Sequence, residues 1–65
     1  MTLAIDMQIL VEGRGRQTNF ATKLLELISR ADTHNRALLR KSFPNAVKVL
    51  EHYQETGKFL EMEYD

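Results

Sequence analysis

Apolar and polar positions alternate along the first part of the chain. Every odd position from Leu3 to Val11 is apolar, and two of the four positions between them are polar. A period of two is typical of a half-buried strand. The alanine, methionine, glutamine and leucine found here also favour helices, so a helix is the alternative. We expect a strand over residues 3–11, ended by Gly13 and Gly15.

The middle of the chain shows the spacing of three and four residues that is typical of amphipathic helices. We expect helices over about 19–31, 33–42 and 44–56. Each is flanked by residues that favour the start or the end of a helix: Thr18 or Asn19, Asp32, Pro44 and Gly57. The apolar stripes of these helices predict one core, made of Phe20, Leu24, Leu27, Ile28, Leu38, Val47, Leu50 and Tyr53.

A second alternation closes the sequence. Leu60, Met62 and Tyr64 alternate with acidic residues, which predicts a short second strand. Two strands at the two ends of a chain can pair with each other and pack on helices. The predicted fold is a single domain over residues 1–65, α+β and mostly helical, in the order β-α-α-α-β. A small all-α bundle is the alternative.

Length and cysteine content limit how such a fold is stabilised. The chain has 65 residues, 43% of them hydrophobic, and no cysteine. A domain this small buries only about 60% of its unfolded surface, and without cysteine it has neither disulfides nor thiolate metal sites. Close helix packing and self-association are the remaining reinforcements.

The apolar residues outnumber the positions that three short helices can hide. A surplus of apolar surface in so small a domain indicates an interface. We therefore expect a homo-oligomer, most simply a dimer, or a complex with another protein. The candidate interface residues are Met7, Leu10, Leu39, Phe43, Phe59 and Leu60.

The charges fall in blocks although the net charge is zero. Residues 13–48 carry an excess of six positive charges, and residues 49–65 carry an excess of four negative ones. The basic block predicts contact with a polyanion such as nucleic acid, or neutralisation by the acidic end of the chain. The candidate polyanion-binding residues are Arg14, Arg16, Arg36, Arg40 and Lys41.

The sequence contains no motif that would place side chains together for catalysis. His34 and His52 are the only histidines, and no set of three or four zinc ligands has the spacing of a metal site. The serines lack a glycine-flanked nucleophile motif. We expect no enzyme activity, no cofactor, no metal and no small-molecule substrate.

The first residues of the sequence do not predict a signal peptide. A signal peptide would require a basic residue before its apolar run, and none is present here. Asp6 and Gln8 also interrupt the run. No apolar run approaches the length that spans a bilayer. We expect a cytoplasmic protein without a membrane partner.

Residues 31–47 read A-D-x-x-N-R-x-x-L-x-x-x-F-P-x-x-V, and Tyr53 follows them. This stretch resembles a pattern in small bacterial and phage-borne proteins. The resemblance implies a bacterial or phage origin and brings no activity or functional residue with it. The sequence as a whole predicts a small non-enzymatic binding or regulatory module that acts by protein–protein contact. A DNA-binding protein with a basic central face is the alternative.

Overall fold

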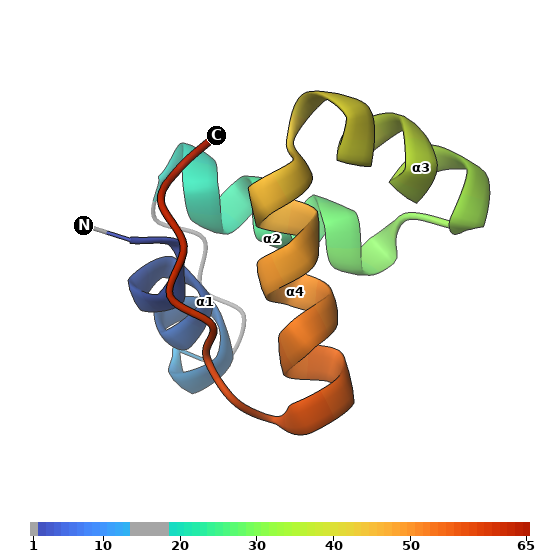
Figure 1. Cartoon of the computed structure of the whole chain (residues 1–65). Helices are drawn as coiled ribbons and strands as arrows, with labels where there is room; N and C mark the ends of the chain where they lie inside the picture. Colours follow the sequence, from blue (N-terminus) through green and yellow to red (C-terminus); the bar gives the residue numbers. More distant parts are fainter. Residues whose placement is uncertain (1, 14–18) are drawn as a thin grey trace.

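Four α-helices make up the fold (Figure 1). The computed structural model describes residues 2–13 and 19–65, and within them it contains these helices and no strand. The helices are α1 (Leu3–Glu12), α2 (Phe20–Arg30), α3 (Thr33–Ser42) and α4 (Pro44–Thr56). The predicted β-α-α-α-β arrangement is therefore wrong, and the fold is small and all-helical.

Residues 3–11 belong to α1 and not to a strand. The buried apolar side chains of α1 include Leu3, Met7 and Leu10, which are separated by four and three residues as on one face of a helix. Ile5, which the alternating pattern would bury with them, is exposed. The apolar residues of this segment fit both periods. The buried face of the helix includes Leu10, at an even position, together with Leu3 and Met7 at odd positions.

The second predicted strand is an extended segment without a sheet. Residues 58–65, called the C-terminal segment below, run back from the end of α4 along α1 (Figure 1). Leu60 and Met62 are half-buried against the core, while Glu61 and Glu63 are exposed. Its neighbour α1 is a helix whose backbone groups bond within the helix, so no ladder of strand hydrogen bonds forms.

Helices α1, α2 and α4 enclose the core. The side chains that are almost wholly buried include Leu3, Leu25, Ile28, Val47, Val49 and Leu50. Helix α3 buries no residue and packs on α4, and its Leu39 is half-buried against the core. The longest helix, α4, has 13 residues, and no helix in the described ranges has the length and apolar character needed to cross a membrane.

The backbone N–H groups at the N-termini of the four helices find hydrogen-bond acceptors in two different ways. Helices α2 and α3 have local caps, because the Asn19 side chain accepts from the Thr22 backbone N–H and Asp32 accepts from that of Asn35. These caps confirm the predicted helix starts. Neither α1 nor α4 has a side-chain cap from its own N-cap residue. Acceptors from the C-terminal segment bond to the first amides of both.

Candidate functional site

An apolar groove lies between α2 and α3. It has a volume of about 470 Å³. The residues that line it are Leu27, Arg30, Ala31, Asp32, Asn35, Leu38 and Leu39. Leu27 is 55% exposed and Leu38 is 49% exposed, which is high for leucines in a folded domain. We call the apolar part of this surface, formed by Leu27, Ala31, Leu38 and Leu39, the α2–α3 face.

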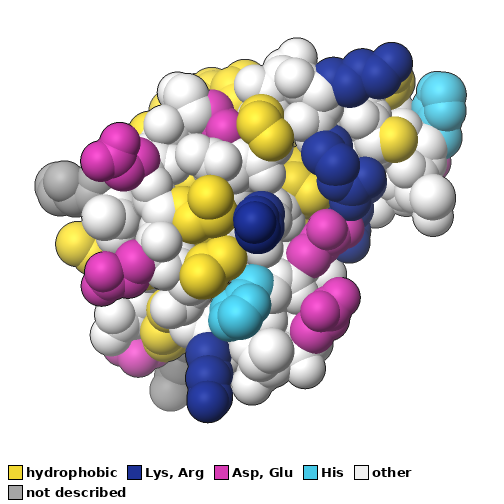
Figure 2. Space-filling view, in the orientation of Figure 1, with side chains coloured by type: hydrophobic (Ala, Val, Ile, Leu, Met, Phe, Trp, Pro, Cys, Tyr) yellow, Lys and Arg dark blue, Asp and Glu magenta, His cyan; other side chains and the backbone are white. Residues whose placement is uncertain are grey.

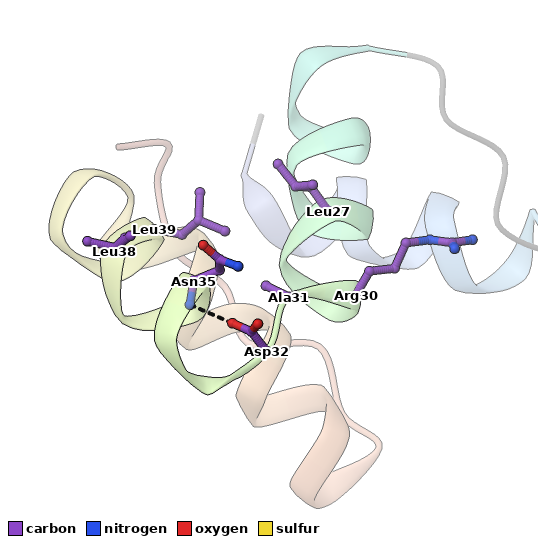
Figure 3. Close-up of a pocket in the computed structure, with 7 residues that line it drawn as sticks. All are labelled: Leu27, Arg30, Ala31, Asp32, Asn35, Leu38 and Leu39. Carbon is purple, nitrogen blue, oxygen red and sulfur yellow. Dashed lines mark hydrogen bonds between the residues drawn. The ribbon is translucent and has the colours of Figure 1, made fainter.

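The arrangement of side chains in the groove follows from the two helices (Figure 3). Leu27 projects from α2, and Leu38 and Leu39 belong to the facing helix α3. Asp32 closes the end where the helices join, and its carboxylate accepts from the Asn35 backbone N–H at 2.7 Å. The wall of the groove is therefore apolar, and its closed end is polar.

Helix α2 leaves apolar residues outside because it has two apolar sides. Leu25 and Ile28 are fully buried against α1 and α4. Leu27 and Phe20, seven residues apart, share another side of the helix and are exposed, Phe20 by 69%. Since α3 packs mainly on α4, this second side stays exposed, with the Phe20 ring beside that of Phe43 and Leu27 facing the groove. The prediction that Phe20, Leu27 and Leu38 belong to the core was wrong.

Charged residues of both signs border the groove. Arg30 points away from the leucines in Figure 3 and pairs with Glu26 on its own helix, with Nε and Oε1 2.6 Å apart. Asp32 lies at the closed end of the groove and is exposed. No group of three or more His, Cys, Asp or Glu able to hold a metal occurs in the part of the chain that the structure describes. The groove offers apolar burial with a polar border.

The predicted polyanion-binding residues are only partly brought together. Arg14 and Arg16 lie outside the described residues. Arg36 and Arg40 both pair with Glu51 of α4, at 3.6 Å and 2.7 Å. The acidic end of the sequence thus neutralises part of the basic block through Glu51. Lys41 is exposed at the end of α3.

Arg36 also holds the helices together. Its Nη2 donates to the Ile28 carbonyl at the end of α2, at 3.0 Å, and its Nη1 donates to Gln54 Oε1 of α4 at 3.3 Å. Its side chain is 20% exposed, against 48% for that of Arg40. In Figure 2 the Lys and Arg side chains gather over α3 and the start of α4, while acidic side chains lie along the C-terminal segment.

The structure places the predicted interface residues largely inside the molecule. Met7 and Leu10 are buried in the core. The other four are half-buried and pack against the core: Leu39, Phe43, Phe59 and Leu60. Of these six, Leu39 alone lines the groove. The exposed leucines Leu27 and Leu38 were missed, since spacing within one helix does not reveal which neighbour covers it.

A second group of polar contacts joins the C-terminal segment to α1 and α2. Asp6 is fully buried, and its Oδ1 accepts from Asn19 Nδ2 at 3.1 Å. Its Oδ2 accepts a short hydrogen bond from the Tyr64 hydroxyl. This hydrogen bond, together with desolvation and the negative charge of Asp6, raises the pKa of Tyr64 above its usual value. The sequence pattern did not single out either residue for this role.

Beside Tyr64 lies a small apolar hollow of about 130 Å³. Its lining includes Phe20 of α2 and Phe43, whose ring centroids are 6.0 Å apart. Asp65 borders the same hollow. Phe20 is thus exposed next to the C-terminal segment and is separate from the α2–α3 face.

Comparison with protein-family models, with curated proteins and with solved structures found no match for this chain. The function is therefore argued from the surfaces described above.

Proposed function

We propose that this protein is a small non-enzymatic contact module that pairs with a second copy of itself through the α2–α3 face. The observation that carries the proposal is the pair of exposed leucines, Leu27 and Leu38, on two different helices of one groove. Isolated exposed apolar residues are common, but a clustered apolar surface with a polar border is typical of a binding site.

The size of the molecule supports pairing. A standard interface removes about 800 Å² from each partner, which is about a fifth of the 4379 Å² that this chain exposes. Each square ångström of apolar surface removed from water contributes about 25 cal/mol. Since a domain of 65 residues has a small core, such an interface would add substantially to its stability.

The charges favour a second copy as the partner. The net charge is zero, so two copies do not repel each other through their overall charge. In a two-fold dimer the same surface meets itself. Arg30 at the border already pairs with Glu26 of its own helix, so it adds no unpaired positive charge to the contact.

Light scattering coupled to size-exclusion chromatography tests the proposal. We expect a dimer for the natural chain and a monomer for Leu27→Asp and Leu38→Asp, because each places a charge in the contact. Ile5→Asp is the matched control: Ile5 is 43% exposed on α1, outside the groove, and this variant should remain dimeric. A natural chain that stays monomeric at all concentrations, or a dimer that survives both leucine changes, would contradict the proposal.

Nucleic-acid binding is a second candidate, supported by the Lys and Arg side chains that gather over α3 (Figure 2). Contacts to phosphate release counterions, so such binding weakens steeply as salt increases. The test is the same chromatography of the protein together with a DNA duplex of mixed sequence at low salt. A complex that dissociates in high salt, and that the double variant Arg40→Ala with Lys41→Ala does not form, would support this function. If no complex forms at low salt, the function is excluded.

A further inference from the structure

The C-terminal segment is held on the rest of the molecule as a bound peptide is held by a receptor. Its Met62 carbonyl accepts from the Leu3 backbone N–H at 2.8 Å. The Asp65 carboxylate accepts from the backbone N–H groups of Asn45 and Ala46, at 2.7 Å and 3.0 Å. The Tyr64 hydroxyl donates to Asp6, as described above. The Glu63 carbonyl accepts from Asn45 Nδ2 at 3.1 Å, so each of the last four residues bonds to the surface beneath.

Apolar contacts accompany these hydrogen bonds. The Phe59 ring stacks on that of Tyr53, with centroids 5.4 Å apart and planes 12° from parallel. Leu60 and Met62 pack against the core, while the side chains of Glu61 and Glu63 face away and are exposed. Alternate side chains therefore supply the contacts, which is how extended peptides are read by their binding sites.

The groups that receive the segment belong to the first 56 residues. They are the first amides of α1 and α4, the buried Asp6 carboxylate and the apolar floor. Helices α2 and α3 carry their own caps, whereas α1 and α4 have none from their N-cap side chains. These two helices thus leave amide donors for an acceptor that comes from elsewhere.

The site extends past the segment that occupies it. Next to Tyr64 and Asp65 is the hollow of about 130 Å³ lined by Phe20 and Phe43. Phe20 is the most exposed of the large apolar residues described. A peptide that carries an apolar residue directly after its acidic position would reach this hollow and cover the Phe20 ring.

We propose that this surface is a recognition site for an extended acidic peptide of a partner protein, with the C-terminal segment as its internal occupant. The peptide would carry, in order, an apolar residue, any residue, a tyrosine, an acidic residue and a further apolar residue. The tyrosine hydroxyl is selected by Asp6, the acid by the amides of α4, and the last residue by Phe20. The site lies apart from the α2–α3 face, so this inference does not rest on the proposed dimer.

The C-terminal segment competes with an added peptide for the same surface, and this competition determines whether a variant should bind the peptide more tightly or more weakly. A short tether holds a segment at an effective concentration in the millimolar range, which a partner peptide must overcome. Weakening the internal segment should therefore strengthen binding of an added peptide. A peptide that copies the segment could also refill the place of a loosened structural segment, so the sign alone does not identify a partner peptide. An added leucine after the acidic position, which has no counterpart in residues 58–65, separates the two, because a purely structural segment gives it no effect.

The experiment measures the fluorescence anisotropy of a labelled peptide that copies residues 58–65 and ends in one added leucine. It is titrated with the full chain and with the full chain carrying Tyr64→Phe and Asp65→Ala. We expect about tenfold tighter binding to the variant, since a hydrogen bond to a charged group and a helix cap are removed from the competitor. Equal or weaker binding to the variant would overturn the proposal.

Three controls show which groups read the peptide. In the same variant background, Asp6→Asn should weaken binding of the peptide, and circular dichroism verifies that this near-isosteric chain is folded. Replacing the added leucine by serine should weaken binding about tenfold, and Phe20→Ala should remove that difference. A peptide whose affinity ignores all three changes, or a natural chain that exchanges its own segment between copies, would refute a partner peptide as the occupant.

Discussion

Asp6 links three parts of the chain because both of its carboxylate oxygens are used as acceptors. Asn19 donates to one oxygen and Tyr64 to the other, while the residue is shielded from solvent. A buried carboxylate is costly unless such donors compensate for its lost hydration. The position of Asp6 within an apolar run therefore reflects a structural need, which the alternating pattern alone treated as a solvent-facing site.

The Tyr64 hydroxyl makes stability depend on pH in the alkaline range. The pKa of Tyr64 is raised in the folded protein by its hydrogen bond to Asp6, by burial and by the charge of Asp6. The protonated phenol stabilises the fold fully below the unfolded pKa of about 10, and this contribution is lost as pH rises through the folded pKa. We expect the free energy of unfolding to fall above about pH 10, as measured by urea denaturation.

Two conservative variants isolate this effect from the titration of lysines. Tyr64→Phe lacks the phenol and should lose less stability over the same pH range than the natural chain. Tyr53→Phe makes the same substitution at the other tyrosine of the chain and serves as the comparison. Identical alkaline profiles for the natural chain and Tyr64→Phe would show that the hydrogen bond to Asp6 has no such effect.

At the scale of elements, Arg36 determines how α3 is attached. Its guanidinium bonds to the end of α2 and to Gln54 and Glu51 of α4. We expect Arg36→Ala to lower the free energy of unfolding by about 1–3 kcal/mol, because it removes hydrogen bonds from a charged group to Ile28 and Gln54, although the Ile28 carbonyl keeps the Ala31 N–H. Arg40→Ala removes a more exposed pair and should cost about 0.2–1 kcal/mol. Chemical denaturation of the two variants measures the difference, and equal losses would contradict it.

The elements that the sequence predicted correctly are those with local signals. Asn19 and Asp32 cap their helices, and Gly57 ends α4 with φ of 73°, in the left-handed region that glycine favours. Residues 3–11 were mispredicted because their apolar positions fit both periods, and only packing against α2 and α4 selects the helix. The groove was not predictable, since it results from α3 packing on α4 and leaving Leu27 uncovered.

At the scale of the whole molecule, stability depends on a few fully buried side chains. A domain of this length has about 3–10 kcal/mol of stability at ordinary values per residue. Leu50 is almost fully buried in α4, and Leu50→Ala should cost about 2–5 kcal/mol. We expect this variant to lose roughly half of its free energy of unfolding and to unfold at a lower urea concentration, as measured by circular dichroism.

Leu38→Ala is the matched control for Leu50→Ala. It makes the same chemical change on α3, where the side chain is about half exposed and lines the groove. At low protein concentration, where copies do not pair, it should alter the free energy of unfolding by less than about 0.5 kcal/mol. A large loss from Leu38→Ala under these conditions would show that this leucine belongs to the core after all.

The backbone amides of the molecule should fall into two groups that differ in their protection from hydrogen exchange, and α3 forms the less protected group. It buries no residue, and Arg36 and Leu39 provide much of its hold on its neighbours. Its backbone hydrogen bonds can therefore open while the core of α1, α2 and α4 stays intact. In native-state hydrogen exchange, the amides of α3 should exchange early and with little dependence on denaturant, whereas those around Leu25 and Leu50 should await global unfolding. A partner seated on the α2–α3 face would slow both groups, because local opening of α3 and global unfolding each remove its binding site.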